Sequence, residues 1–253
     1  MPLSLAQLAF LFAVALMAGV IDAIAGGGGL LTLPALLAVG LPPHLALGTG
    51  KGSSVFGVFA SLVRYFRSGF VDTRRARATF PLALAGSALG ATLVLRISPA
   101  ALKPVVLALL VTVATLLALR PATPKPRAER PPRHDLALAG VVALVIGAYD
   151  GFFGPGTGTF LIFAFVTLFA LPMARASADA KIVNFASNLA AAAIFASRGT
   201  VLWRAALPMA AGQLCGGWAG AHLAVKGGDA LVRRIVLLVV AALVIKLALD
   251  VLR

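Results

Sequence analysis

The sequence predicts an all-α polytopic membrane protein made of two pseudo-symmetric halves. The chain has 253 residues, of which 60% are hydrophobic and only 12% are charged. Soluble domains carry about 25% charged residues, so this chain has too little polar surface to cover a globular fold in water. Long apolar runs recur along nearly the whole length, and their order in the first half returns in the second.

The first half, residues 1–119, contains four or five candidate helical segments. A helix that crosses a bilayer needs about 20 apolar residues. Four long runs lie near 4–25, 44–66, 78–95 and 100–119, and a shorter run lies near 30–40. The short run follows four consecutive glycines, which predicts a broken or re-entrant helix at that point.

One hydrophilic segment, residues 120–135, separates the halves. It is rich in proline and arginine, which are unsuited to hydrocarbon, and it predicts a cytoplasmic linker. The stretch 64–77 also contains five arginines and one aspartate and is predicted to lie on the same side. These loops account for much of the net charge of +14, so we expect no nucleic-acid partner.

The second half, residues 136–253, repeats the pattern of the first, giving 8–10 segments in total. Long runs lie near 136–153, 176–197, 203–224 and 230–252, with a shorter run near 157–171. A shift of 130 positions pairs Lys51 with Lys181, Gly86 with Gly216 and Gly90 with Gly220. These matches at one constant shift predict an internal duplication of the sequence. The halves are inverted if all five segments of each cross the membrane, and parallel if each short segment is re-entrant.

Two glycine-rich motifs predict helix breaks at membrane depth. The first follows Asp22 and the second follows Asp150, each four residues before a glycine. Such breaks are tolerated where backbone lines a cavity, and the helix that starts after each one offers free N–H groups to an anion. The alternative is close helix packing through small residues. The predicted binding residues at the breaks are Gly27, Gly28, Gly29, Gly156 and Thr157.

Each half also has a lysine inside an apolar segment. A lysine there costs at least about 2.5 kcal/mol, so it needs a partner or a water-filled cavity. Helical spacing places Asn184 and Asn188 on the face of Lys181, and Ser54 on the face of Lys51. An ammonium among neutral donors suits a small oxyanion. Alternatively, each lysine pairs with an aspartate (Asp22, Asp150 or Asp179) as a structural contact, or extends to the membrane interface. The predicted binding residues of this group are Thr49, Lys51, Ser53, Lys181, Asn184 and Asn188.

The two membrane aspartates have two interpretations. Asp22 and Asp150 either bind a coupling proton or sodium ion, or cap the broken helices and pair with the lysines. The three histidines are scattered and Cys215 is the only cysteine, so the sequence predicts no metal centre, no disulfide and no catalytic constellation. A membrane-embedded enzyme is therefore disfavoured, and no cofactor is expected.

Several longer motifs resemble the sulfite exporter TauE/SafE family, also called the toluene sulfonate uptake permease family. They are Leu-Pro-Pro-x-x-Ala-x-Gly-Thr at 41–49, Arg-Tyr-x-x-x-Gly-x-Val-Asp at 64–72, and Tyr-Asp-Gly-Phe-Phe-Gly-Pro-Gly-Thr-Gly at 149–158. The resemblance covers nearly the whole chain. It implies a multi-pass permease of the bacterial inner membrane that moves small sulfur-containing or organic anions such as sulfite, sulfonates or sulfoacetate.

These observations lead to one functional prediction. We expect an ion-coupled secondary transporter of a small anion, embedded in the lipid bilayer and able to form a homo-oligomer. An anion channel, or a carrier of a different small metabolite, is the alternative. A channel would differ in lacking saturation and coupling.

Overall fold

The computed structural model describes residues 3–119 and 135–251, and all regular structure in these ranges is helical. The predicted linker at 120–135 lies outside the described residues, except for Asp135, which begins a helix. The helices are α1 (Leu5–Ala25), α2 (Gly29–Ala38), α3 (Pro43–Arg67), α4 (Thr73–Val94), α5 (Pro99–Leu119), α6 (Asp135–Phe152), α7 (Thr157–Phe169), α8 (Met173–Ser197) and α9 (Trp203–Val251). The predicted all-α class is confirmed.

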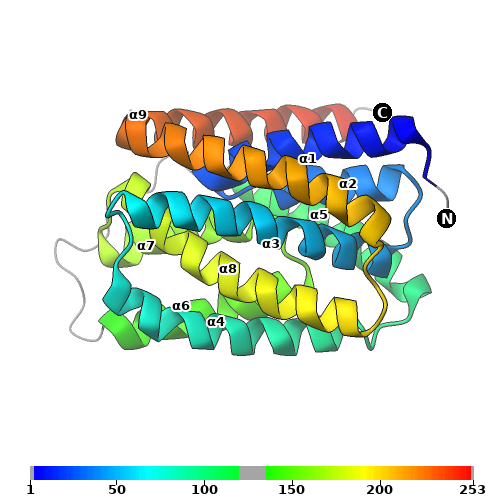
Figure 1. The fold of residues 1–253 in the computed structure, drawn as a ribbon, viewed down its shortest axis with the longest axis horizontal. Coiled ribbons are helices and arrows are strands. Elements are labelled where there is room, and N and C mark those ends of the chain that lie inside the picture. The colour runs from blue at the N-terminus through cyan, green and yellow to red at the C-terminus, as the bar shows by residue number, and fades with distance from the viewer. Residues whose placement is uncertain (1–2, 120–134, 252–253) are drawn as a thin grey trace.

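Helix α9 contains the last two predicted segments. Gly228 interrupts it with φ 58° and ψ −159°, a conformation open to glycine but strained for other residues. The chain reverses direction at this residue, so the orange and red parts of α9 lie side by side in Figure 1. Ten helical segments are therefore present in the described ranges, as many as the upper sequence prediction.

The segments differ in their ability to cross a membrane. Four helices, α1, α4, α6 and α8, are long and apolar enough to span a bilayer. Helices α2 and α7 have only 10 and 13 residues. At 1.5 Å per residue they measure about 15 and 20 Å, short of the ~30 Å hydrocarbon core. The fold is that of a polytopic membrane protein with two half-length helices, one after each glycine-rich motif.

Glycines set the helix directions through close packing. Three glycines of α9 lie against main-chain carbonyls of α1, and the residue numbers rise together: Gly212 on Phe12, Gly216 on Leu16 and Gly220 on Val20. Helix α4 packs on α6 in the same way, with Gly86 on Leu144 and Gly90 on Ala148. Each of these helix pairs is therefore parallel. We call α1, α3 and the part of α9 before Gly228 the first bundle, and α4, α6 and α8 the second bundle.

The two bundles run in opposite directions (Figure 1). Tyr65, near the end of α3, donates to the carbonyl of Ala23 at 2.9 Å and contacts Ser177, near the start of α8. Thr49, near the start of α3, accepts from the backbone N–H of Leu202, just beyond the end of α8. Helices α3 and α8, which the 130-residue shift of the sequence pairs with each other, are thus antiparallel, as the inverted alternative of the sequence prediction requires.

This orientation coexists with short second helices, which the sequence prediction had treated as incompatible. The prediction assumed that a short segment enters and leaves on the side where the preceding helix ends. Instead the chain folds back at each break, so α1–α2 and α6–α7 form hairpins (Figure 1). The apolar cluster around Leu36 of α2 accordingly includes Leu11 from the first half of α1.

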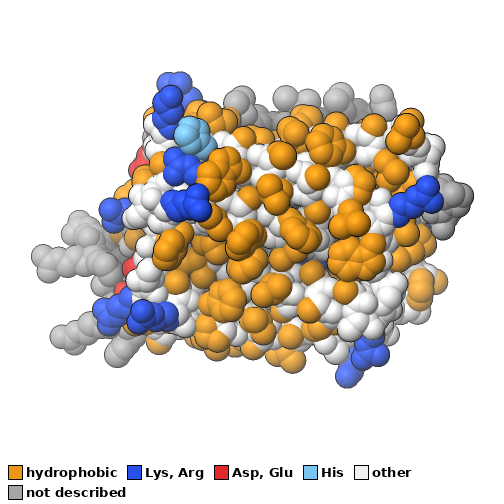
Figure 2. Space-filling view, viewed as in Figure 1, with side chains coloured by type: hydrophobic (Ala, Val, Ile, Leu, Met, Phe, Trp, Pro, Cys, Tyr) orange, Lys and Arg blue, Asp and Glu red, His pale blue; other side chains and the backbone are white. Residues whose placement is uncertain are grey.

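Two apolar clusters occupy opposite ends of the molecule. One contains Tyr65, Phe165 and Phe169, and the other contains Phe153 and Phe195. On the face seen in Figure 2, hydrophobic side chains cover the middle, and Lys and Arg gather at the two ends. This pattern is the one expected of a surface in contact with lipid and, at its ends, with headgroups and water.

Candidate functional site

The two predicted helix breaks touch each other. Gly26 ends α1 with φ 77°, and its carbonyl accepts from the backbone N–H of Thr159 at 3.1 Å. The Thr159 hydroxyl also donates to the carbonyl of Ala25 at 2.8 Å. A Cβ on Gly26 would overlap the backbone of Gly158, so the contact requires glycine there. The breaks thus join the two halves backbone to backbone.

Each break is followed by a helix that begins without a side-chain cap. Gly28 precedes α2 and Gly156 precedes α7, and neither offers a side chain to the first turn. The first N–H groups of a helix have no partner within the helix and carry a partial positive charge. The positive ends of two half-length helices therefore meet inside the protein.

Both membrane lysines form ion pairs, and the partners are exchanged between the halves. Lys51 Nζ lies 2.7 Å from Asp150 Oδ1, and Lys181 Nζ lies 2.8 Å from Asp22 Oδ2. Each lysine is the ninth residue of a 25-residue helix, α3 or α8. Of the pairings that the sequence left open, those with Asp22 and Asp150 are present, whereas Asp179 pairs with Arg75.

Further donors surround the two carboxylates. Asp150 Oδ2 accepts from the Ser187 hydroxyl and from Asn188 Nδ2, the latter at 3.3 Å. Asp22 Oδ1 accepts from the backbone N–H of Gly28 at 3.3 Å, and Lys181 also donates to the main-chain carbonyl of Asp22. Asp22 therefore holds the start of α2, while Asp150 is held by side chains of α3 and α8.

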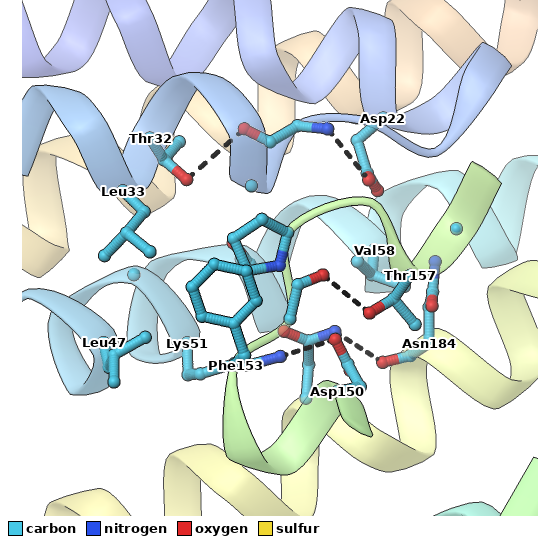
Figure 3. Close-up of a pocket in the computed structure, with 18 of the residues that line it drawn as sticks. Asp22, Thr32, Leu33, Leu47, Lys51, Val58, Asp150, Phe153, Thr157 and Asn184 are labelled. Carbon is cyan, nitrogen blue, oxygen red and sulfur yellow. Dashed lines mark hydrogen bonds and ion pairs between the residues drawn. The ribbon is translucent and has the colours of Figure 1, made fainter. Parts of the chain in front are cut away.

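A small cavity lies where these groups converge (Figure 3). Its volume is about 50 Å³, several times the ~10–15 Å³ that one buried water needs. A small polyatomic ion is therefore within its size range, and a large metabolite is not. Eight predicted site residues line it: Asp22, Gly28, Gly29, Lys51, Asp150, Thr157, Asn184 and Asn188.

Five other predicted site residues do not line the cavity. Thr49 binds the turn before α9, and the Ser53 hydroxyl donates to the carbonyl of Gly50 at 2.9 Å. Lys181 lies behind Asp22, its ion-pair partner. Gly27 and Gly156 belong to the backbone of the breaks.

Asn184 has an unusual environment among the lining residues. Its side chain is buried, and its Oδ1 atom has no hydrogen-bond partner in the structure. Figure 3 shows it beside Thr157, at the edge of the cavity. An unpaired buried acceptor costs about 1–3 kcal/mol, and amide oxygen and nitrogen are interchangeable by rotation. The site thus contains one amide oxygen that is buried and accepts no hydrogen bond within the described residues.

The binding residues predicted from the sequence did not include Gln213 or Ser54, which also line the cavity. Gln213 of α9 is buried, and its Nε2 donates to Ser54 Oγ at 3.3 Å. The spacing of Ser54 from Lys51 was a usable signal for that residue. A lone glutamine in an apolar segment was a signal for Gln213, because such polar residues seldom lack a role in a membrane. Gln213 has no polar counterpart 130 positions earlier, where Ala83 stands.

No three His, Cys, Asp or Glu side chains within residues 3–119 and 135–251 are grouped as metal ligands would be. The charged side chains that line the cavity are instead Asp22, Lys51 and Asp150, and the ammonium of Lys181 is paired with Asp22 from behind. This arrangement can exchange one anionic partner of a lysine for another.

Comparisons with known proteins agree with a role in transport. The family model described as "Sulfite exporter TauE/SafE" matches residues 11–247. A "Probable membrane transporter protein ORF9" from Sinorhizobium sp is 38% identical over 96% of this chain and 93% of its own length. A "Probable membrane transporter protein" from Haemophilus influenzae is 38% identical over 99% and 98%. The "Probable membrane transporter protein YfcA" of Escherichia coli K12 is 35% identical over 96% and 90%. No solved structure matches the chain.

Proposed function

Because the chain belongs to the sulfite exporter TauE/SafE family of membrane transporters, we propose that it is an ion-coupled secondary transporter of a small sulfur-containing or organic anion, such as sulfite, a sulfonate or sulfoacetate. The observation that carries this proposal is the cavity between the two helix breaks. The starts of α2 and α7, the ammonium of Lys51 and the unpaired amide oxygen of Asn184 surround one small volume, and Lys181 lies behind Asp22 at its edge.

The lysine–aspartate pairs suggest how binding is coupled to an ion. In the structure each ammonium already has a carboxylate partner. An anionic substrate competes with that carboxylate for the ammonium. A proton or sodium ion taken up by Asp22 or Asp150 neutralises the carboxylate and makes the lysine available. Substrate and cation therefore favour each other's binding, which is the thermodynamic requirement for coupled transport.

The proposed substrate contacts come from both halves. The lysines supply charge, and neutral groups supply direction. Asn184 is the strongest neutral candidate because its amide has an unpaired atom at the cavity. The other proposed contacts are those that line the cavity, namely Gly28, Gly29, Thr157 and Asn188, whereas Gly27, Thr49, Ser53 and Gly156 lie outside it.

The exchanged ion pairs support a duplicated, inverted architecture with repeats at 1–119 and 136–253. Asp22 and Asp150 are 128 positions apart and the lysines are 130 apart, and each aspartate binds the lysine of the other half. Inverted repeats with broken helices and a central site are typical of secondary transporters. The arginines of 64–77 favour a cytoplasmic position for that end of the molecule in a bacterial inner membrane.

A thermal-shift screen tests the proposal. The purified full chain is heated with sulfite, thiosulfate, taurine, sulfoacetate, acetate or chloride, each with and without sodium and at several pH values. A ligand that binds the folded state at a hundred times its Kd stabilises it by about 2.7 kcal/mol. We expect one sulfur oxyanion or organic anion to raise Tm in a sodium- or proton-dependent way. Stabilisation by cations or neutral solutes alone would contradict an anion site.

Variants of the two lysines identify the site. We expect Lys51→Ala and Lys181→Ala to abolish the anion-dependent rise in Tm, while Lys103→Ala, at an exposed position of α5, keeps it. Each single substitution leaves a carboxylate without its partner. Two double variants therefore remove each pair as a whole: Lys51→Ala with Asp150→Asn, and Lys181→Ala with Asp22→Asn. Wild-type affinity in all of these variants would exclude the site.

Flux measurements separate a carrier from a channel. In proteoliposomes we expect uptake that saturates with anion concentration and accelerates with an imposed proton or sodium gradient. Uptake that rises linearly with concentration and ignores both gradients would indicate a channel instead.

A further inference from the structure

An apolar groove lies on the outer surface between α3 and α4. It is separate from the cavity at the two helix breaks. Its volume is about 560 Å³, within the ~300–1,000 Å³ range of small-molecule sites. Ile182 of α8 forms part of it and is buried. The other apolar lining residues are Leu62, Val63, Phe66, Val71, Ala76, Phe80 and Pro81. The groove is therefore accessible from the lipid side and apolar along its length.

Two arginines stand in this otherwise apolar groove. Arg67 ends α3 and Arg77 lies in the second turn of α4, so both belong to the arginine-rich end of the molecule. Neither forms an ion pair with any residue in the described ranges, whereas Arg75, two residues before Arg77, is paired with Asp179. Arg67 stacks over the ring of Trp218 at 5.8 Å, which orients the guanidinium without neutralising it.

We propose that this groove binds one anionic phospholipid, with an acyl chain along the apolar lining and the phosphate between Arg67 and Arg77. Arginine matches phosphate oxygens with two parallel N–H donors, and basic pockets at the ends of membrane helices select anionic headgroups. The commitment to an anionic lipid follows from charge complementarity, because two unpaired cations flank an apolar volume. The inference does not depend on the transported substrate.

The other half of the chain supplies an internal comparison. The positions 130 residues beyond Arg67 and Arg77 are Ser197 and Leu207. Neither of these two positions carries a cation, and the arginines near them are Arg198 and Arg204. The proposed site is therefore assigned to the end of the molecule that holds Arg67 and Arg77.

Tryptophan fluorescence provides a direct test, because the chain has two tryptophans. In Trp203→Phe the remaining reporter is Trp218, beside Arg67. The full chain is reconstituted with phosphatidylglycerol or phosphatidylcholine carrying the same brominated acyl chains, which quench nearby tryptophan. We expect half-maximal quenching at a roughly tenfold lower mole fraction of phosphatidylglycerol, from two arginine–headgroup contacts.

Matched variants decide the interpretation. Arg67→Gln with Arg77→Gln should bring the two quenching curves together, and Arg67→Lys with Arg77→Lys should keep part of the difference. Arg74→Gln, an exposed arginine outside the groove, should keep all of it. If the double glutamine variant does not fold, each single variant should lose part of the difference.

Three results would overturn the proposal. One is equal quenching of Trp218 by both lipids in the otherwise unmodified chain. Another is an undiminished preference in the double glutamine variant. The third is protection of Trp218 from both lipids together with a dimeric mass, which would show that a second copy of the chain covers the groove. In Trp218→Phe the remaining reporter is Trp203, which lies at the other end of the molecule. Its fluorescence should be quenched equally by phosphatidylglycerol and phosphatidylcholine.

Discussion

The two lysine–aspartate pairs use the same residue types at corresponding places, yet their surroundings differ. In the Lys51–Asp150 pair the side chains are 8% and 3% exposed. Ser187 and Asn188 also donate to Asp150, so its carboxylate is fully engaged inside the protein. In the Lys181–Asp22 pair the lysine is 0% exposed, but Asp22 is 18% exposed.

This difference assigns distinct tasks to the two aspartates. Asp150 is fixed by three side-chain donors from two helices, so it positions Lys51 and holds α3, α6 and α8 together. Asp22 can be reached by a small cation, and it binds both Lys181 and the N–H of Gly28. A change of charge at Asp22 is thus passed to the start of α2. Within the proposed mechanism, Asp22 is the better position for the coupling ion.

The largest expected loss of stability comes from breaking the contact between the two helix breaks, which brings the two lysine–aspartate pairs close to each other. Gly26→Ala adds a methyl group that overlaps the Gly158 backbone at φ 77°, so we expect a loss of more than about 4 kcal/mol of unfolding free energy or no folded protein. Gly40→Ala is the matched control, because Gly40 has φ 89° with nothing within 4 Å of the new atom. It should cost only about 1–2 kcal/mol. Equal losses of Tm in the two variants would mean that the breaks do not depend on their contact.

The two aspartates themselves should differ in their effect on stability. Asp150→Asn leaves Lys51 buried without a counter-charge and turns an NH₂ group toward the donors Ser187 and Asn188, or toward Lys51. We expect a loss of about 3–5 kcal/mol. Asp22→Asn should cost about 1–2 kcal/mol, since Lys181 keeps the main-chain carbonyl of residue 22 and water reaches the site.

Thermal unfolding of both variants in the same detergent measures this contrast. The double variant Asp150→Leu with Lys51→Met, which removes the buried charges together, should recover part of the stability lost in Asp150→Asn. A larger loss for Asp22→Asn than for Asp150→Asn would reverse the assignment of the fixed and the accessible carboxylate.

The smallest effect on stability, and the most informative about binding, is expected at Asn184. Serine stands at the corresponding position 54, so Asn184→Ser makes the two sides of the cavity alike. Removing an unpaired buried acceptor offsets the lost packing, and we expect the unfolding free energy to stay within about 1 kcal/mol of wild type.

The same variant should lose at least half of the rise in Tm produced by the anion that stabilises the wild type most. Asn188→Ser is the comparison for stability and not for binding, because Asn188 is itself a proposed contact and donates to Asp150 and to the main-chain carbonyl of Asn184. It should lower Tm without ligand. An anion response in Asn184→Ser equal to wild type would remove Asn184 from the site.

Much of the fold was predictable because membrane helices leave simple marks in a sequence. Apolar runs gave the segments, and the short runs after the glycine motifs marked α2 and α7. Asp22, Lys51 and Asp150 were predicted because charged groups in lipid require a partner, and Asn184 and Asn188 because they share a helix face with Lys181. All five line one cavity.

The unpredicted features depend on three-dimensional pairing. Helical spacing can place Lys51 on a face, but it does not say that the face meets Asp150, 99 residues away. The backfolding after Gly26 depends on the fit between Gly26 and Gly158, which neither motif reveals alone. Gln213 reaches the cavity because α9 packs against α3 at Gly57, and that is a property of the assembled bundle.

The glycine contacts between parallel helices have a consequence for motion. Gly86 and Gly90 fix α4 to α6, and Gly216 and Gly220 fix α9 to α1, so each rigid unit combines helices from both halves of the chain. Both central ion pairs, in contrast, run from one bundle to the other. A displacement that exposes the cavity would therefore separate the two bundles along the boundary that these ion pairs cross, and each bundle would move as one body. The helices that move together are then not the helices that belong to the same half of the sequence.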